Sequence, residues 1–174
     1  MSQLLENDDS NRRRALELES FIVEAPAGAG KTELLTQRYL RLLATVDEPE
    51  EIIAITFTNK AAGEMRQRIQ DSLKLAREGR MPEAAHKRIT YELARAALAR
   101  SSELNWQIEA QPGRLRLTTI DALCAGLARQ MPLLSRFGTQ PAVADDAKRH
   151  YEEAARRALE HLEGRNEDER VHAD

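Results

Sequence analysis

A glycine-rich octapeptide between two apolar segments limits the folds that this chain can adopt. It reads Ala25-Pro26-Ala27-Gly28-Ala29-Gly30-Lys31-Thr32. Residues 21–23 before it are aromatic or β-branched, and apolar residues recur at helical spacing after it. Glycines let the backbone wrap closely, so that successive N–H groups and the positive end of the next helix face a bound phosphate. The sequence therefore predicts a strand, a phosphate-binding loop and a helix.

The residue types within this loop indicate nucleotide chemistry. The general pattern is G-x-x-x-x-G-K-[ST], and Ala25 stands in place of the first glycine. We expect Lys31 to reach the β- and γ-phosphates and the Thr32 hydroxyl to ligate Mg²⁺, which makes both residues catalytic candidates. An ordinary turn that precedes Lys-Thr by chance is the alternative, and the flanking strand and helix disfavour it. The predicted nucleotide-binding residues are Ala25, Pro26, Ala27, Gly28, Ala29, Gly30, Lys31, Thr32 and Glu33.

Further segments extend this unit into an α/β pattern. The helix after the loop ends at the acidic and proline residues 47–49, and the apolar run 52–55 predicts a strand covered on both faces. Residues 59–80 predict a second long helix, and residues 115–119 alternate as a strand does. Strand, helix, strand and helix in this order are typical of a parallel sheet with right-handed crossovers.

The remaining segments are mostly helical by pattern. We expect partial helix over 12–19, and helices over 82–110, 121–134 and 145–162, with an unpatterned tail from 163 to 174. Plausible buried positions in the second of these are Ala84, Leu93, Ala97 and Leu98.

Composition narrows the class of protein. The 174 residues carry 26 Lys+Arg and 29 Asp+Glu, a formal net charge of −3, which argues against a polycationic nucleic-acid arm. With 41% hydrophobic and 32% charged residues, the chain has the composition of a globular protein. The single cysteine, Cys124, cannot form an internal disulfide. No apolar signal core or membrane span is evident, so a cytoplasmic protein without a membrane partner is expected.

Charge is distributed unevenly along the chain. Residues 60–100 contain ten Lys/Arg against five Asp/Glu, whereas residues 145–174 contain six against ten. Two interpretations stay open for the basic segment: solvated helical faces, or a surface that meets a phosphate backbone.

Two motifs in order resemble a known family. Residues 20–38 contain the phosphate loop, and residues 52–65 read Ile-Ile-Ala-Ile-Thr-Phe-Thr-Asn-Lys-Ala-Ala-Gly-Glu-Met. Together they closely resemble the UvrD/RecB class of superfamily 1 DNA helicases, especially the AddA/RecB-like helicase–nuclease branch, in which alanine often replaces the first loop glycine. Residues 56–62 match motif Ia, which contacts single-stranded DNA, and residues 119–124 resemble motif Ib, where histidine is more usual at the position of Asp121.

The resemblance implies a fold, an activity and its partners. The fold would be a P-loop NTPase (RecA-like) α/β parallel sheet with flanking helices, incomplete here, plus a helical insertion and the start of a helical subdomain. The activity would be ATP-driven 3′→5′ translocation on single-stranded DNA in recombinational repair, with ATP and Mg²⁺ as cofactors. Single-stranded or duplex-end DNA and a partner nuclease/helicase subunit would be the partners, and an exonuclease domain would belong to the full-length chain.

The DNA-binding residues that the resemblance implies follow a predicted strand. They lie at the carboxyl end of the strand, which is the ligand edge of an open α/β sheet. Phe57 is expected to stack on a base, and core packing is its alternative. Asn59 has a second possible role as a helix N-cap, as does Asp121. Cys124 is expected to be a buried small hydrophobe. The set is Thr56, Phe57, Thr58, Asn59, Lys60 and Thr119.

Other parts of the family's machinery are not evident in the sequence. Residues 142–146 are the only Walker B candidate, and we reject them, because Asp145 and Asp146 fit the cap and first turn of a helix better. The adenine-reading glutamine is missing, and Asp9, Asn11 or an arginine of residues 12–14 could replace it. Trp106 is expected to serve packing.

This inventory sets the expected domain organisation. Residues 1–144 would form the N-terminal part of a first RecA-like ATP-binding domain, with a helical insertion at about 80–112, and residues 145–174 would begin a helical subdomain. The fragment alone is expected to lack ATPase and helicase activity. A small P-loop kinase and a non-catalytic P-loop binding module stay open as alternatives.

Overall fold

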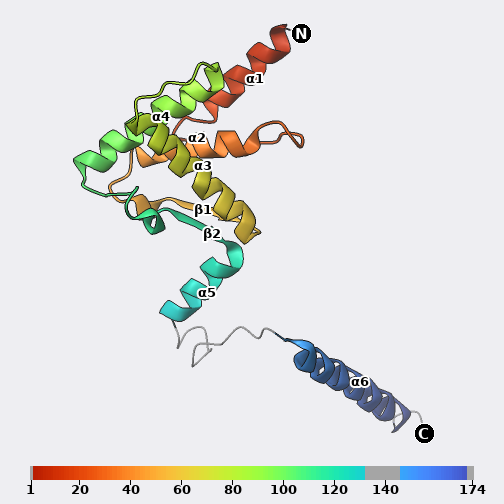
Figure 1. Ribbon diagram of the computed structural model, residues 1–174. Coiled ribbons are helices and arrows are strands. Elements are labelled where there is room, and N and C mark those ends of the chain that lie inside the picture. Colours follow the sequence, from red (N-terminus) through yellow and green to blue (C-terminus); the bar gives the residue numbers. More distant parts are fainter. Residues whose placement is uncertain (1, 132–145, 172–174) are drawn as a thin grey trace. The chain divides into compact units, whose positions relative to one another are not determined.

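The computed structural model describes residues 2–131 and 146–171 (Figure 1). Two compact units are distinguished, residues 1–127 and residues 128–174. The described elements are α1 (Ser2–Arg14), α2 (Lys31–Leu43), the 3-10 turn Pro49–Glu51, β1 (Ile53–Thr56), α3 (Asn59–Arg77), α4 (Ala85–Glu103), the 3-10 turn Pro112–Arg114, β2 (Arg116–Thr119), α5 (Ile120–Gln130) and α6 (Lys148–Val171).

The two described strands pair in parallel, as the pattern of alternating strands and helices predicts. Their register joins Ile53 to Arg116 and Thr56 to Thr119. The carboxyl ends of β1 and β2 are therefore neighbours, and each leads directly into the loop or helix that follows it. The α/β class with a parallel sheet is confirmed.

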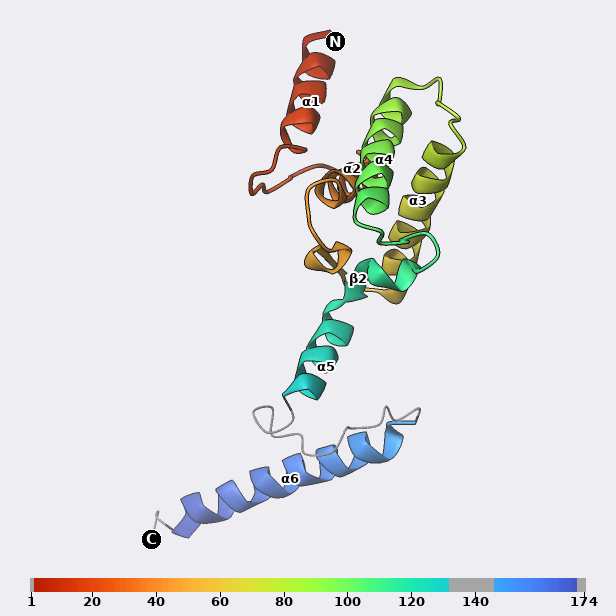
Figure 2. The ribbon, with the colours of Figure 1, turned by 90° about the vertical axis from the view of Figure 1, so that its left-hand side faces the viewer.

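Three helices and the sheet enclose the core. Helix α4 packs against both α2 and α3, and Figure 2 shows α3 and α4 side by side. Helix α3 also contacts both strands. Buried side chains from each element meet there; they include Tyr39, Leu40, Leu43, Ile69, Leu73, Ala94, Ala97, Trp106, Ile108, Leu115 and Leu117.

Within residues 2–131 and 146–171 the sheet is covered on one face only, so the expectation of a strand buried on both faces is wrong for β1. Ile52 is 7% exposed, whereas Ile53 and Ile55 are 43% and 51% exposed. Side chains of a strand alternate between faces, and in β1 the face that carries Ile53 and Ile55 is the exposed one. In β2 the buried Leu117 and Thr119 alternate with more exposed neighbours, as predicted.

Several other expectations need correction. Residues 21–23 form no strand, and Ile22 is fully exposed, because no other described segment pairs with them. The first helix spans Ser2–Arg14 instead of 12–19, which places three arginines at its negative carboxyl end. Cys124 is exposed, and so is Ala84, which precedes α4 as its N-cap residue.

Helix α6 is longer than the predicted segment 145–162, since it extends to Val171 through the tail that lacks an apolar pattern. Ion pairs at helical spacing join Lys148 to Glu152 and Arg156 to Glu160. Such pairs stabilise an exposed helix without any apolar face.

An arginine ties together the segments that enter the two strands. Arg114 contacts Glu50 and Glu48, in each case with 2.6 Å between nitrogen and oxygen, and its Nη1 donates to the carbonyl of Trp106 at 2.9 Å. The hydrogen bond from Arg114 lowers the pKa of Glu50. Trp106, 2% exposed, donates from Nε1 to the carbonyl of Asp47 at 2.9 Å. Trp106 therefore packs, as expected, and the amino ends of β1 and β2 form one cross-linked cluster.

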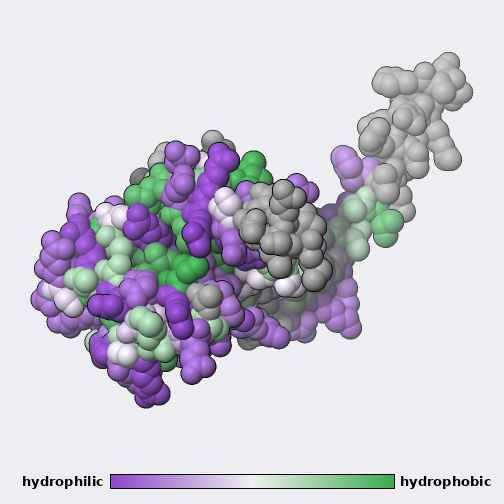
Figure 3. All heavy atoms as spheres, turned by 90° about the horizontal axis from the view of Figure 1, so that it is seen from above, coloured by the Kyte–Doolittle hydropathy of each residue, from purple (hydrophilic) through white to green (hydrophobic). Residues whose placement is uncertain are grey.

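The described surface agrees with the charged composition. Seen from above in Figure 3, hydrophilic residues cover most of the visible face, and hydrophobic ones form smaller patches between them. Among the described helices, none combines the length and the apolar character that crossing a membrane requires.

Candidate functional site

The glycine-rich loop leads directly into α2. Gly28 and Gly30 have φ values of 78° and 76°, a left-handed conformation that residues with a Cβ rarely adopt. Gly30 is the N-cap position of α2, and its carbonyl accepts from Leu34 at 3.1 Å. The first backbone N–H groups of a helix have no intrahelical acceptor, and the helix dipole places positive potential there. The loop geometry therefore suits an anion at the start of α2.

Lys31 places its ammonium group against this loop. Nζ donates to the carbonyls of Ala25 and Pro26, at 2.7 Å each. Both acceptors belong to the first half of the loop, and Lys31 is the first residue of the helix after it. The positive charge of Lys31 thus links the two ends of the octapeptide.

The next two residues point to different surroundings. Thr32 is exposed in the first turn of α2, and its carbonyl accepts from the Thr36 hydroxyl at 2.9 Å. The Glu33 carboxylate accepts from the Thr90 hydroxyl of α4 at 2.5 Å, and Gln37 donates to that same hydroxyl at 2.9 Å. Glu33 therefore joins α2 to α4, and its contact with a nucleotide stays a prediction.

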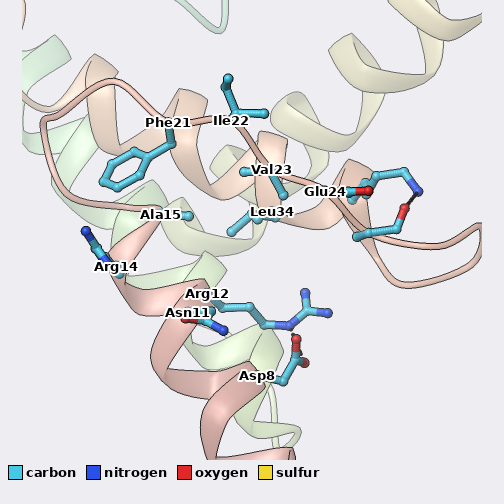
Figure 4. A pocket seen from close by; sticks show the side chains of 12 residues that line it. Asp8, Asn11, Arg12, Arg14, Ala15, Phe21, Ile22, Val23, Glu24 and Leu34 are labelled. Atoms are coloured by element: carbon cyan, nitrogen blue, oxygen red, sulfur yellow. Dashed lines mark hydrogen bonds and ion pairs between the residues drawn. The ribbon is translucent and has the colours of Figure 1, made fainter.

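Helix α1 borders the loop across a cavity of about 330 Å³ (Figure 4). Arg12 of α1 donates from Nη2 to the carbonyl of Ala29 at 2.7 Å, and from Nε to Asp8 at 2.8 Å. Sequence reasoning named the arginines 12–14 only as possible base readers and missed this contact. The lining residues are Asp8, Asn11, Arg12, Arg14, Ala15, Phe21, Ile22, Val23, Glu24, Ala25, Lys31 and Leu34.

A second arginine, also missed, fixes the chain between α1 and the loop. Arg38 of α2 donates to the carbonyls of residues 15, 17 and 19, at 2.6, 2.8 and 2.5 Å. Its guanidinium also lies 5.2 Å from the centre of the Phe21 ring. The sequence around Arg38 carries no signal for such contacts, because its acceptors are backbone atoms.

The loop after β1 presents polar and aromatic side chains to the surface. Phe57 is 87% exposed, so the core-packing alternative is wrong. The Thr58 hydroxyl accepts from the backbone N–H of Ala61 at 3.1 Å, which makes Thr58, and not Asn59, the N-cap of α3. Asn59 and Lys60 are exposed in the first turn of that helix. In Figure 1 this loop and the glycine-rich loop lie at the same side of the first unit.

The end of β2 is more enclosed. Thr119 is 7% exposed, and its hydroxyl accepts from the backbone N–H of Ala122 at 3.2 Å. Thr119 therefore caps α5, so the expected capping role of Asp121 is wrong. Thr56, the register partner of Thr119, is partly buried. A direct contact of Thr119 with a ligand stays a prediction.

The structure divides the ten basic residues of the 60–100 segment. Arg66 donates to the carbonyl of Leu117 at 2.8 Å, and Arg77 pairs with Glu109. Arg80, Arg95 and Arg100 form ion pairs, and Arg88 donates to a carbonyl. No side-chain partner is found, within the described residues, for Lys60, Arg68, Lys74 and Lys87. Six of the ten are therefore engaged within the chain, and a contact of the other four with a phosphate backbone stays a prediction.

Some predicted features lie outside the described residues. These include residues 142–145 of the rejected Walker B candidate, and the expected domain boundary at 144/145. Asp146 is described, and it accepts at 2.9 Å from the backbone N–H of Lys148, the first residue of α6. In the described parts of the chain, no three His, Cys, Asp or Glu residues gather as metal ligands would.

Comparison with known proteins relates the chain to helicases. The sequence model of the UvrD/REP helicase N-terminal domain matches residues 7–170. The chain is 49% identical over 76 residues to DNA helicase II of Haemophilus influenzae, which covers 42% of this chain and 10% of that protein. It is 35% identical over 133 residues to an ATP-dependent helicase/nuclease subunit of Pelotomaculum thermopropionicum. That match covers 73% of this chain and 9% of that protein. The same subunit of Desulfitobacterium hafniense is 33% identical over 131 residues, a match that covers 74% of this chain and 8% of that protein. The chain spans about a tenth of the length of these relatives.

Proposed function

Because this chain belongs to the UvrD/REP helicase family, we propose that it is the N-terminal ATP-binding portion of an ATP-dependent DNA helicase. One observation carries the proposal. The left-handed glycine loop leads into α2, whose first residue, Lys31, donates back to that loop, and an exposed Phe57 loop follows the parallel strand β1 of the same unit. The first arrangement suits a nucleotide phosphate, and the second suits an unpaired base.

We assign the nucleotide site to residues 25–33. The backbone N–H groups of Gly30 and the first turn of α2 would bind the phosphate oxygens, and Lys31 would exchange its two carbonyl acceptors for the β- and γ-phosphates. The exposed Thr32 hydroxyl would hold Mg²⁺, whose charge offsets that of the phosphates. These residues fit the two cofactors because they combine anion-binding amides with a surface hydroxyl next to them.

We assign the DNA site to the loop between β1 and α3. Phe57 would stack on a base, because its ring is exposed and needs no hydrogen-bond partner. Thr56, Thr58, Asn59 and Lys60 would contact the phosphate backbone, and Thr119 would act at the adjacent strand end. The likeness to the two helicase/nuclease subunits extends the proposal to 3′→5′ translocation, recombinational repair, a nuclease domain elsewhere in the whole protein and a second protein partner.

The finer fold belongs to the same proposal. The parallel pair β1–β2 with α2 and α3 against it would be part of a RecA-like P-loop domain over residues 1–144, with α4 within a helical insertion at about 80–112. Residues 145–174 would begin a helical subdomain. The family match disfavours the small kinase and the binding module, since neither accounts for the Phe57 loop.

Two binding measurements on the 174-residue chain test this function. A fluorescent ATP analogue with Mg²⁺ should bind weakly, and Lys31→Ala should weaken it at least about tenfold, since a charge-assisted hydrogen bond is lost. A labelled single-stranded oligonucleotide should lose affinity about five- to tenfold in Phe57→Ala, with nucleotide affinity unchanged. Tyr151→Ala is the matched control, because Tyr151 is also an exposed aromatic residue but lies on α6.

Other outcomes would contradict the proposal in distinct ways. Nucleotide affinity unaffected by Lys31→Ala would favour a non-catalytic module, and phosphoryl transfer to a small acceptor would favour a kinase. We expect no ATP hydrolysis by this chain, with or without DNA. DNA-stimulated hydrolysis would show that the catalytic set is complete within 174 residues.

A further inference from the structure

A side chain of helix α1, Arg12, donates a hydrogen bond to the phosphate loop. Arg12 Nη2 donates to the carbonyl oxygen of Ala29 at 2.7 Å, and this bond joins residues that are 17 positions apart. Asp8, one helical turn earlier, accepts from Arg12 Nε at 2.8 Å (Figure 4). Asp8 of α1 thus orients the Arg12 guanidinium, and the guanidinium in turn binds the Ala29 carbonyl of the loop.

The acceptor of this bond, the Ala29 carbonyl, belongs to the peptide unit that also carries the Gly30 N–H. A trans peptide is planar, so the carbonyl of Ala29 and the N–H of Gly30 point in opposite directions within one rigid unit. A donor that fixes the Ala29 carbonyl therefore also fixes the direction of the Gly30 N–H. Gly30 has φ 76°, and among the described hydrogen bonds the one from Arg12 is the only one on this peptide unit, so the loop's own bonds do not fix its direction.

The carboxyl end of α1, which carries Arg12, is itself fixed in place. Arg38 of α2 donates to three carbonyls of the segment that follows α1, and it lies against Phe21. The carboxyl end of α1 is thereby connected to the helix that the phosphate loop precedes. Two contacts therefore join the same parts of the chain: Arg38 connects the segment after α1 to α2, and Arg12 connects α1 to the loop before α2.

We propose that Arg12 is a positioning residue of the phosphate loop: oriented by Asp8, it holds the Ala29 carbonyl and so aims the Gly30 N–H toward the bound phosphate. The proposal rests on the nucleotide-binding function proposed above. It differs from a role in reading the base, because the atom that Arg12 contacts belongs to the loop that receives the phosphates.

The test compares two ligands in four variants of the 174-residue chain. The ligands are ATP and inorganic tripolyphosphate, each with Mg²⁺, and the variants are Arg12→Ala, Arg12→Lys, Asp8→Ala and Arg13→Ala. Arg13 is the matched control, because its substitution removes the same charge from the same helix turn, although Arg13 does not line the cavity. A second readout, taken without any ligand, is the ¹³C shift of the Ala29 carbonyl, which responds to loss of a hydrogen bond.

We expect Arg12→Ala to weaken both ligands about tenfold and to move the Ala29 carbonyl shift. Arg12→Lys should recover most of the affinity, since an ammonium can still donate to the carbonyl. Asp8→Ala should have a smaller effect of the same kind, and Arg13→Ala should have none.

Three results would overturn the proposal. The first is an Arg12→Ala variant that loses affinity for ATP but not for tripolyphosphate, which indicates base reading. The second is an equal loss of affinity in Arg12→Ala and Arg13→Ala, which indicates a general charge effect. The third is an Ala29 carbonyl shift that does not move in Arg12→Ala. If neither the natural chain nor Lys31→Ala binds tripolyphosphate, the proposed nucleotide function fails instead, and the carbonyl shift still decides whether Arg12 holds the loop.

Discussion

The two ends of the small parallel sheet are built in opposite ways. At the amino ends of β1 and β2, Arg114 joins Glu48, Glu50 and the Trp106 carbonyl, and the Trp106 ring is almost fully buried. At the carboxyl ends, Phe57 is 87% exposed and Thr58 makes only a local capping bond. The cross-linked end can hold the strands in place, which leaves the exposed loop after β1 available to a ligand.

Truncation of one aromatic residue at each end should give the largest difference in stability between an end that holds the strands and an end that is available to a ligand. Trp106→Ala should lower the free energy of unfolding by about 3–5 kcal/mol, because it removes a buried ring and leaves a cavity. Phe57→Ala should change it by less than about 0.5 kcal/mol, since the ring is on the surface. Urea denaturation followed by circular dichroism measures both. Similar losses in the two variants would break the comparison.

Alkaline pH should weaken the amino end through Tyr39. Burial raises the pKa of Tyr39 to about 12, and the nearby Arg66 charge offsets only part of this effect. Below pH 10 the phenol is neutral in both states, so its contribution to stability is complete. As pH rises from 10 through 12, only the unfolded chain ionises freely, and stability falls by up to roughly 3 kcal/mol. Tyr39→Phe should lack this component, and denaturation curves at pH 9 and pH 12 should diverge between the two proteins.

A pair of glycine substitutions compares the glycine-rich loop with the turn at the amino end of β2. Gly28→Ala should cost about 1 kcal/mol, because Gly28 has φ 78°, and it should also weaken nucleotide binding. Gly113→Ala, in the 3-10 turn before β2, should be neutral, since its φ is not positive and a Cβ there meets no atom within 4 Å. Melting temperatures and nucleotide titrations of both variants check this. A costly Gly113→Ala would show hidden strain at the amino end.

The smallest expected effect concerns the ion pair of Glu50. Its pKa is lowered by the Arg114 hydrogen bond, so its contribution is present above the ordinary pKa of 4.5 and is lost as pH falls below it. The difference in stability between the natural chain and Glu50→Gln should therefore shrink in acid. It should stay below about 1 kcal/mol at pH 7, since the carboxylate is partly exposed and screened by solvent. A difference that does not change between pH 7 and pH 3 would exclude this ion pair as its source.

Local patterns predicted the elements whose causes are local. Alternation identified β2, the glycine spacing identified the loop, and apolar spacing identified α2 and α3. Residue type does not fix the cap of α3: Thr58 and Asn59 are both good capping residues, and the choice between them depends on where the backbone becomes helical. The strand expected at 21–23 was wrong, because a strand exists only where a neighbour pairs with it.

The amino-acid sequence alone determined the position of the glycine-rich loop, the parallel α/β order and the family, since these depend on residue types at short, fixed spacings. Only the tertiary structure decided that Phe57 faces solvent, that Thr119 caps α5, and that Arg12 and Arg38 reach backbone carbonyls far along the chain. The physical reason is the same in each case. Exposure and long-range hydrogen bonds depend on which segments become neighbours, and a carbonyl acceptor has no signature in the sequence.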